Sequence, residues 1–308
     1  MKQPKTSIII LNWNGWKDTI GCLDSLSKIS YPHYEVIVVD NASNDDSLQK
    51  IREWTKKKLI KKFLLLENDK NYGFAEGNNI AIRHILKEKN STYILFLNND
   101  TIVDKKFLSE LIKVARNNSK AGIVGSKIYY YPPKRKENRI QSCGAEIDFS
   151  KGKLVNYGDG EIDQGQFSKT KKVGYVYGAS MLAKQKVLDK IGFFDKKFFA
   201  FAEEADLCFR AKKAGYLTFF APKSIIWHKA GASVKKVPGF SDYYRTRNLF
   251  WLERKHTTSI QFFSFLVNYF FQLPWIIYCQ YLKPKQFFLL KAYLRGLRDG
   301  ILGYSFIS

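Results

Sequence analysis

The first 125 residues alternate between short apolar runs, rich in β-branched residues, and longer segments with helical periodicity. The short runs lie at 7–11, 34–40, 61–67, 93–97 and 122–125, and the helical segments lie at 16–29, 47–58, 75–89 and 105–117. Strands that alternate with helices of about 10–15 residues form right-handed βαβ units. The alternation therefore predicts an α/β fold with a mostly parallel sheet and flanking helices.

The chain changes character after residue 125. Residues 126–172 are rich in Tyr, Gly and Lys, and they predict an irregular insertion or a hairpin. The pattern then predicts strands at 173–183 and 216–222 and helices at 184–192 and 203–215, which end on Gly192 and Gly215. We expect three parts, at 1–125, 126–256 and 257–308, the last of them helical.

The C-terminal part begins with residues 257–282, which include no charged side chain. This stretch is long enough to span a membrane. It also contains polar residues and a proline and is flanked by cations: Gln261, Asn268, Gln272, Pro274, Arg254, Lys255, Lys283 and Lys285. These features favour a segment that lies in the membrane interface, as a peripheral or monotopic attachment. A buried pair of helices and a true span are the alternatives.

The formal net charge of +23 calls for a negatively charged partner. Residues 211–308 hold 15 Lys and Arg against 3 Asp and Glu, beside the uncharged stretch. An anionic membrane surface fits this arrangement, because each well-placed cation contributes roughly 1 kcal/mol there. Nucleic-acid binding is the rival interpretation, but it gives no role to the acids at 203–206, so we expect no nucleic-acid partner.

The cysteines and the N-terminus indicate the cytoplasm. Four cysteines, at 22, 143, 208 and 279, form no CxxC pair, which argues against a zinc ribbon or a disulfide framework. The N-terminal residues enter a strand at once and lack the apolar region of a signal peptide. We expect a cytoplasmic protein that attaches to the cytoplasmic face of the membrane.

Polar residues follow the predicted strands, where open α/β sheets bind their ligands. Asp40 ends one strand, where a carboxylate can bind a ribose or a base; a helix cap is the alternative. In ILFLNND (94–100), Asn98 and Asp100 follow another strand, and Asn99 reads as a turn residue. A single carboxylate holds Mg²⁺ mainly with the help of substrate phosphates, so Asp100 predicts a metal that arrives with a diphosphate.

The loop NDKNYGFAEGNN (68–79) follows the third strand. Gly73 and Gly77 permit a close approach of the backbone, and the amides can bind a nucleotide or cap the next helix. The loop contains neither GK[ST] nor GxGxxG, so it matches no phosphate-binding fingerprint.

Acidic residues begin the helix at 203–215. Glu203, Glu204 and Asp206 lie in its first turn, where the helix dipole favours negative charge. Asp206 and Arg210 have the spacing of a helix ion pair, which is a purely structural role. However, these acids follow an apolar aromatic run. Burying a carboxylate costs free energy, so acids in this position favour a role in a functional site.

Three further residues of the second half are candidates for a site. His228 follows an apolar strand, and a satisfied structural histidine is the alternative interpretation. Arg245 and Arg247, in YYRTRN, could hold a diphosphate with two parallel hydrogen bonds. Arginines that simply face the solvent are the alternative.

Taken in order, these segments resemble the family 2 glycosyltransferases, and specifically their rhamnosyltransferase-like branch. The resemblance rests on SIIILNWNG (7–15), VVDNASND (38–45), NYGFAEGNN (71–79), FLNNDT (96–101), the stretch 177–216 with FAFAEEADLCFRAKKAGY, WHKAGAS (227–233) and YYRTRNLFWLERKH (243–256). It implies a GT-A fold, with a Rossmann-like nucleotide half followed by a less regular acceptor half. It also implies transfer of a sugar from a nucleotide diphosphate, with inversion at the anomeric carbon.

The resemblance assigns roles to the candidate residues. Asp40 would bind the base or the ribose, and the nucleotide pocket would be lined by residues of the first and third motifs: Asn12, Asn71, Gly73, Gly77 and Asn78. Asp100 and His228 would hold Mg²⁺ or Mn²⁺, with Asn98 in the position of the first acid of the DXD motif and Arg247 near the leaving diphosphate. Glu204 falls on the position of the general base, and Asp206 is the second candidate.

We therefore expect a metal-dependent inverting hexosyltransferase of cell-surface polysaccharide synthesis. Its donor would be a dTDP-, UDP- or GDP-sugar, such as rhamnose, and its acceptor a glycan or a polyprenyl-diphosphate-linked sugar. A catalytically impaired sugar-binding scaffold is an alternative because of Asn98 and Glu204. A nucleotidyltransferase is another, although NWNGW (12–16) replaces its usual phosphate loop. The sequence leaves the sugar, the acceptor, the linkage and the oligomeric state open.

Overall fold

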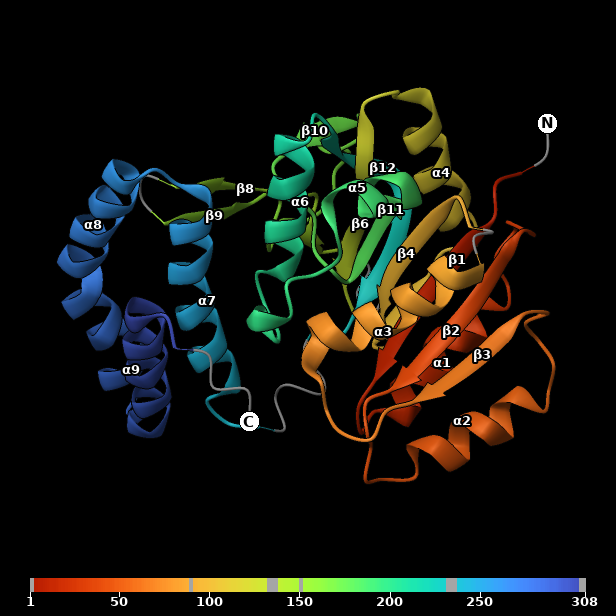
Figure 1. The fold of residues 1–308 in the computed structure, drawn as a ribbon, viewed down its shortest axis with the longest axis horizontal. Coiled ribbons are helices and arrows are strands. Elements are labelled where there is room, and N and C mark those ends of the chain that lie inside the picture. The colour runs from red at the N-terminus through yellow and green to blue at the C-terminus, as the bar shows by residue number, and fades with distance from the viewer. Residues whose placement is uncertain (1–2, 89–90, 132–137, 150–151, 231–236, 305–308) are drawn as a thin grey trace.

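The computed structural model describes residues 3–88, 91–131, 138–149, 152–230 and 237–304. Its centre is a mixed sheet whose strands lie in the order β10-β12-β6-β11-β4-β1-β2-β3, with β5 and β7 paired at its side (Figure 1). The strands of the first half are β1 (Thr6–Asn12), β2 (Tyr34–Asp40), β3 (Phe63–Glu67), β4 (Tyr93–Asn98), β5 (Thr101–Val103) and β6 (Ala121–Tyr130). Strands β1 to β4 run parallel, and β6 runs parallel to β12, so the predicted mostly parallel sheet is confirmed.

Helices cover both faces of this sheet (Figure 1). They are α1 (Trp16–Leu26), α2 (Ser47–Thr55), α3 (Gly73–Glu88), α4 (Phe107–Asn117), α5 (Gln185–Ile191) and α6 (Glu203–Lys213). Along β1, Ile8 and Ile10 pack into the core on the side of α1, α2 and α4, whereas Ile9 packs into the core on the side of α3 and α6. This alternation follows from the two-residue repeat of a strand and explains why the centre of β1, residues 8–11, is apolar on both faces.

The second half supplies strands to the same sheet. They are β7 (Ile140–Ser142), β10 (Lys171–Val173), β11 (Ser180–Lys184) and β12 (Leu217–His228), while β8 (Ala145–Asp148) and β9 (Lys153–Asn156) form the separate hairpin allowed for by the sequence. Three details differ from the predictions. The single strand expected at 173–183 is interrupted, because β10 ends at Val173 and β11 begins only at Ser180. The last strand continues to His228 instead of ending near residue 222, and the three-residue strand β5 was not predicted. The proposed boundaries at 125 and 256 remain predictions; β6 itself runs across residue 125.

The C-terminal helices form a separate layer at one end of the molecule, far from β3 and α2 (Figure 1). They are α7 (Phe240–His256), α8 (Ser259–Ile277) with a π-helical extension (Tyr278–Leu282), and α9 (Phe287–Leu302). Helix α9 lies close against α7, because a Cβ at Gly296 would come within 2.4 Å of the Tyr243 carbonyl oxygen. In the described part of the chain, Ser259–Leu282 is long and apolar enough to cross a membrane, and only 11% of its window is buried. Within this chain α8 is therefore mostly exposed, and whether it lies on a membrane, spans one or is covered in another way stays a prediction.

Candidate active site

Asp100, His228 and Asn98 meet at the carboxyl end of β4. The His228 Nε2 lies 3.0 Å from Asp100 Oδ1 and 3.2 Å from Asn98 Nδ2. On the other side of the ring, His228 Nδ1 lies 2.7 Å from Gln141 Oε1, an atom that only accepts hydrogen bonds. The proton of the imidazole is therefore assigned to Nδ1, which directs the electron pair of Nε2 toward Asp100.

Strand pairing brings these residues together from distant parts of the chain. Strand β5 pairs antiparallel with the end of β12, with Thr101 opposite His228. The backbone N–H of Lys229 donates to the Asp100 carbonyl at 3.0 Å and closes this ladder. Asp100, in the turn directly before β5, and His228, at the end of β12, are thus held together by backbone hydrogen bonds.

This donor set fits a divalent cation that is held partly by a substrate. Carboxylate oxygen and neutral imidazole nitrogen are both ligands of Mn²⁺-like ions, and the hydrogen bond to Gln141 orients the ring as is usual for a metal-binding histidine. Within the described residues, no group of three or more His, Cys, Asp and Glu side chains could hold a metal. Asp100 and His228 therefore leave several coordination positions for a diphosphate and water.

A buried chain of polar side chains connects this corner to Asp40. Asn99 donates to the Thr19 hydroxyl at 3.0 Å, Thr19 donates to Asn12 Oδ1 at 2.7 Å, and Asn12 donates to Asp40 Oδ1 at 2.7 Å. Asp40 also accepts two hydrogen bonds from Ser43. Asn99 lies in the expected turn, and its amide also connects the end of β4, through Thr19, to Asn12 at the end of β1.

Asn41, for which we predicted no particular role, organises the loop before α3. Its side chain is 1% exposed. The Nδ2 group donates to Asn71 Oδ1 at 2.7 Å and to the Gly73 carbonyl at 3.2 Å, while Oδ1 accepts from Asn68 and from the Tyr72 backbone N–H. The only sequence signal for this residue is its position directly after Asp40 at the end of a strand.

The remaining residues predicted for the nucleotide pocket have close protein neighbours. Gly73 has φ +73°, a conformation that favours glycine. At Gly77 a Cβ would lie 2.7 Å from Leu11, so this glycine allows α3 to pack on β1. Asn78 is buried and donates to the Phe74 carbonyl within α3. The next residue, Asn79, clamps the backbone N–H and carbonyl of Phe194.

Glu203 and Glu204 begin α6 as two adjacent acids with little access to solvent. Glu203 is 4% exposed, and burial together with the charge of Glu204 raises its pKa well above the ordinary value. Burial also raises the pKa of Glu204, against the opposing effect of Arg245 among other groups. Within the described residues, one oxygen of each carboxyl has no hydrogen-bond partner. Once ionised, a carboxylate with a raised pKa binds a proton more strongly than an ordinary one, so it is suited to accept the proton of a bound hydroxyl.

The segment before these acids is strained and tightly held. Phe199, Phe201 and Ala202 have φ of +63°, +69° and +69°, which costs of order 1 kcal/mol or more for each non-glycine residue. Asn248 donates to the carbonyls of residues 198, 200 and 201. The hydrogen bonds from Asn248 of α7 therefore stabilise the strained turn.

Arg247 requires a correction. Its side chain is 1% exposed, its guanidinium donates to the carbonyls of Lys197 and Phe198 at 2.9 and 3.0 Å, and it lies 4.2 Å from the centre of the Trp251 ring. The aromatic neighbours on α7 bury this arginine, so it holds the acidic turn and does not reach an open diphosphate position. Arg245 is exposed instead, and its charge acts on Glu204.

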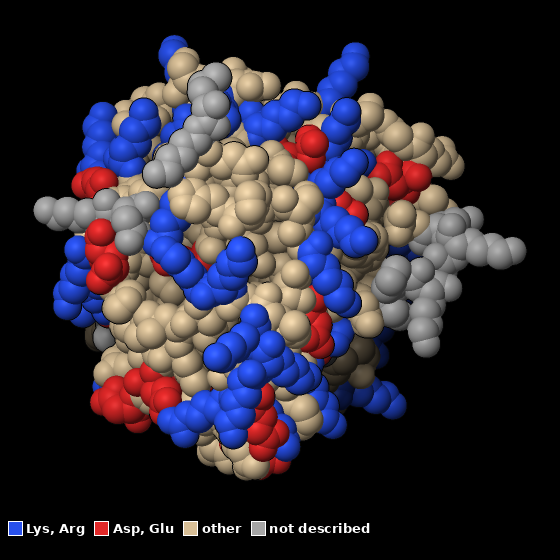
Figure 2. Space-filling model, turned by 90° about the vertical axis from the view of Figure 1, so that its right-hand side faces the viewer, with Lys and Arg blue, Asp and Glu red and all other residues tan. Residues whose placement is uncertain are grey.

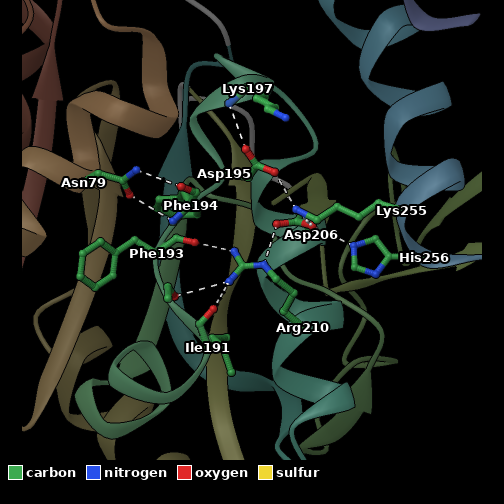
Figure 3. Close-up of polar contacts among 11 residues, drawn as sticks. Asn79, Ile191, Phe193, Phe194, Asp195, Lys197, Asp206, Arg210, Lys255 and His256 are labelled. Atoms are coloured by element: carbon green, nitrogen blue, oxygen red, sulfur yellow. Dashed lines mark hydrogen bonds and ion pairs between the residues drawn. The ribbon is translucent and has the colours of Figure 1, made fainter. Parts of the chain in front are cut away.

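Asp206 lies at the centre of a buried ion-pair network (Figure 3). Its carboxylate is 2.8 Å from Arg210 Nε, 2.9 Å from Lys255 Nζ and 2.8 Å from His256 Nε2. Arg210 also donates to the carbonyls of Ile191 and Phe193, which fastens the loop before the acidic turn. Burial alone would raise the pKa of Asp206, but the hydrogen bond from His256 and the charges of Arg210 and Lys255 lower it to about 2. Such a carboxylate is a weak base, so the structure favours Glu204 over Asp206 as the proton acceptor.

Residues 175–179 link the end of β4, where Asp100 and His228 meet, to the turn that leads to Glu203 and Glu204. The Asn98 backbone N–H donates to the Ala179 carbonyl at 3.2 Å. Burial and then the charge of Glu204 raise the pKa of Tyr177 to about 12, which places Tyr177 within electrostatic reach of that carboxyl. This short segment thus contacts Asn98 through Ala179 and lies within electrostatic reach of Glu204 through Tyr177.

Comparison with known proteins agrees with this geometry. Residues 7–192 match the model of glycosyl transferase family 2. The chain is 27% identical over 208 residues to the low-salt glycan biosynthesis hexosyltransferase Agl10 of Haloferax volcanii, over 67% of this chain and 61% of that protein. It is 25% identical over 262 residues to the dTDP-rhamnosyl transferase RfbF of Shigella flexneri, over 80% of this chain and 79% of that protein. This chain thus spans less than two thirds of the Haloferax protein.

Among solved structures, the mannosyltransferase PcManGT from Pyrobaculum calidifontis, in complex with GDP-Man and Mn²⁺, has a TM-score of 0.60 at 17% identity. The likeness covers 99% of this chain and 77% of that chain, and it concerns the fold. The GT-A fold that the sequence resemblance implied is thereby confirmed. With its family model covering more than half of the residues, the chain belongs to glycosyl transferase family 2.

Proposed function

We propose that this protein is an inverting glycosyltransferase that moves rhamnose or a similar hexose from a nucleotide-diphosphate donor to a glycan or lipid-linked acceptor. The observation that supports this most is the pairing of Asp100 with His228 near a turn that holds Glu204 with a raised pKa. Glycosyl transfer needs both features, one for the departing diphosphate and one for the attacking hydroxyl.

On the donor side, Asp100 and His228 would hold Mg²⁺ or Mn²⁺ together with the diphosphate, and Gln141 would keep the His228 ring oriented. When bound, the ion would neutralise the negative charge that develops on the leaving diphosphate. Asn98 places a neutral amide beside His228, at the position where the DXD motif has its first carboxylate. The nucleotide would lie near Asp40, whose carboxylate keeps acceptor capacity beyond its bonds to Asn12 and Ser43.

On the acceptor side, Glu204 would accept the proton of the attacking hydroxyl. The hydrogen bonds from α7 to the strained turn support this assignment, because they position the Glu204 carboxyl before the acceptor binds. Glu203 would stay protonated beside it, since its pKa is raised further by the neighbouring charge. The acceptor hydroxyl attacks the anomeric carbon in a single displacement, so no covalent sugar–enzyme intermediate is needed.

The site geometry favours turnover over the two alternative functions. A sugar-binding scaffold would not need a carboxyl with a raised pKa on the acceptor side, and a nucleotidyltransferase would need a basic phosphate loop after β1. At that place the chain has Asn12, whose amide is bound to Asp40 and Thr19. We expect the reaction to take place at the cytoplasmic face of a membrane, where polyprenyl-diphosphate-linked acceptors are located.

A thermal-shift panel of dTDP-, UDP- and GDP-sugars, with and without Mn²⁺, tests the donor side. One donor should raise the melting temperature in a metal-dependent way, and Asp100→Ala should abolish the metal-dependent part. Failure of every nucleotide sugar to bind, with or without Mn²⁺, would overturn the proposal.

One variant tests the acceptor side. Glu204→Gln should retain donor binding and lose roughly 10²–10⁴-fold in turnover, the usual contribution of a general base. It should also be at least as stable as the parent at neutral pH, because a buried carboxyl with a raised pKa opposes folding once it ionises. Full activity of Glu204→Gln would move the base assignment to Asp206.

A further inference from the structure

Helix α8 carries a stripe of large apolar side chains on the side that faces away from the protein. Its members recur every three or four residues and are between 43% and 85% exposed: Ile260, Phe263, Val267, Phe270, Phe271, Trp275 and Tyr278. The opposite side of α8 packs through Phe265 and Tyr269 against Phe250 of α7. The inner side of α8 thus packs on the rest of the protein, and the exposed outer stripe indicates an interaction surface.

The polar residues of α8 are compatible with an apolar environment. The Asn268 amide donates to the Ser264 carbonyl at 3.0 Å, and the Gln272 amide donates to the Asn268 carbonyl at 3.3 Å. Thr258 caps the first turn in a capping box with Gln261. Hydrogen bonds that are already made within the helix lower the cost of removing these groups from water.

The segment after α8 supplies positive charge beside this stripe. Between residues 257 and 304 the sequence has five basic residues, Lys283, Lys285, Lys291, Arg295 and Arg298, and one acid, Asp299. Asp299 is fully buried and accepts from Tyr243 and Arg298. Three of the cations line an open groove of about 420 Å³ together with Phe287, Leu290 and Leu294. The groove therefore combines apolar side chains with guanidinium and ammonium groups.

We propose that the exposed face of α8 and α9 docks on an anionic phospholipid bilayer. The apolar stripe enters the interfacial region, and the cations of α9 contact the phosphates of the headgroups. These helices lie at the opposite end of the molecule from β3 and α2, so docking directs the nucleotide half toward the aqueous side (Figure 1). This inference concerns location and does not depend on the proposed reaction.

Charge alone does not identify this face. Figure 2 shows lysine and arginine side chains spread widely over the end that carries β3 and α2, with fewer acidic side chains between them. What distinguishes α8 and α9 is that cations and a continuous apolar stripe occur together. A second copy of the chain would fit this face poorly, because a symmetric contact would place the cations of one copy near those of the other.

A true span is also disfavoured by the packing. To cross a bilayer, α8 would have to leave α7 and expose Phe250, which is fully buried. Truncation of residues 257–308 would be a poor test for the same reason, because α9 packs closely on α7. Substitutions on the exposed face of the full chain avoid this problem.

The first experiment measures sedimentation of the 308-residue chain with vesicles. The protein should bind phosphatidylcholine vesicles that contain about 30% phosphatidylglycerol and bind pure phosphatidylcholine at least about tenfold more weakly. Phe271→Glu should weaken binding at least about tenfold, because it places a charge in the apolar stripe. The matched control is Leu59→Glu, an equally simple change at a residue that is 49% exposed in the other half, and it should bind like the parent.

A second pair of variants separates the charge of α9 from the overall charge. The double change Lys291→Glu and Arg295→Glu should reduce binding at least about tenfold, whereas Lys58→Glu with Lys61→Glu should have less than a twofold effect. Equal losses in both pairs would overturn the proposal, since they would mean that net charge alone attracts the protein.

Three other results would also overturn it. They are equal binding to neutral and anionic vesicles, a stable dimer that Phe271→Glu dissociates without vesicle binding by the parent, and resistance of the membrane-bound protein to alkaline carbonate extraction, which would indicate a span. Melting temperatures of all variants within a few degrees of the parent establish that the loss of binding is not a loss of fold.

Discussion

Replacement of Asp206 by asparagine tests whether this carboxylate is structural or catalytic. Asparagine keeps the shape of the side chain and removes its charge. The side chains of Arg210, Lys255 and His256, which all lie within 2.9 Å of the carboxylate, would then surround a neutral group. Because Asp206 is completely buried, water cannot replace the lost interaction.

The expected loss of stability can be worked from the pKa. Asp206 ionises at about 2 in the folded protein against an ordinary value of 3.8, a difference that corresponds to about 2.5 kcal/mol at neutral pH. Removal of one partner from a buried ion pair costs about 3–5 kcal/mol, which agrees in order of magnitude. We expect Asp206→Asn to lose about 3 kcal/mol and to melt roughly 6–10 °C lower.

The pH dependence has a definite sign. The pKa of Asp206 is lowered by folding, so its contribution is complete above the unfolded value and disappears as the pH falls through about 4 to 2. Urea unfolding at pH 7 and at pH 3 should therefore show the difference between the parent and Asp206→Asn shrinking to about half. Asp195→Asn is the control, because Asp195 contacts the outer, partly exposed side of Lys255, and it should cost less than about 1 kcal/mol.

Enzyme assays on the same protein separate the two roles. At a temperature where the variant is folded, Asp206→Asn should keep its turnover within about tenfold of the parent, whereas loss of the general base costs roughly 10²–10⁴-fold. A variant that is as stable as the parent but inactive would refute the reasoning and identify Asp206 as the base.

Three further predictions concern other parts of the structure. Burial raises the pKa of Glu253 to about 8, so stability should fall as the pH rises from about 5 to 8. Glu253→Gln should therefore be more stable than the parent by about 4–5 kcal/mol at pH 9 but not at pH 5, measured by urea unfolding. Gly296→Ala should cost about 2 kcal/mol because a Cβ would strike the backbone of α7, whereas Gly21→Ala in α1 meets no close atom and should stabilise by about 0.5–1 kcal/mol. Gln141→Leu should weaken Mn²⁺-dependent donor binding about 10–100-fold, without loss of metal-free nucleotide binding, because it releases the His228 ring.

The sequence was most informative where one local rule decides the structure. The repeat of two along each strand and of 3.6 along each helix located most elements of the first half, and the ends of parallel strands placed Asp40 and Asp100 correctly at one edge. These are short-range consequences of the order of residues. The assignment of helix ends at Gly192 and Gly215, which have φ of +78° and +89°, succeeded for the same reason.

Long-range pairing and burial were harder to predict. Asn98 and His228 are 130 residues apart, and they meet because the very short β5 pairs with the end of β12. Gln141 lies in a three-residue strand inside a stretch that had no clear pattern. Arg247 was predicted to hold a diphosphate, with a solvent-facing arginine as the alternative, but the aromatic side chains around it on α7 enclose its guanidinium.

The two sides of the proposed reaction are positioned by a shared contact. Gly73 ends the loop that Asn41 holds, and the Phe199 carbonyl accepts from the backbone N–H of Ala75 at 3.1 Å. A Cβ at Gly73 would lie 2.5 Å from the ring of Phe199, the first strained residue of the turn that leads to Glu204. The loop before α3 and the acidic turn therefore rest directly on each other. A glycine at residue 73 is required for this contact, so we expect a change in the position of either segment to disturb the other.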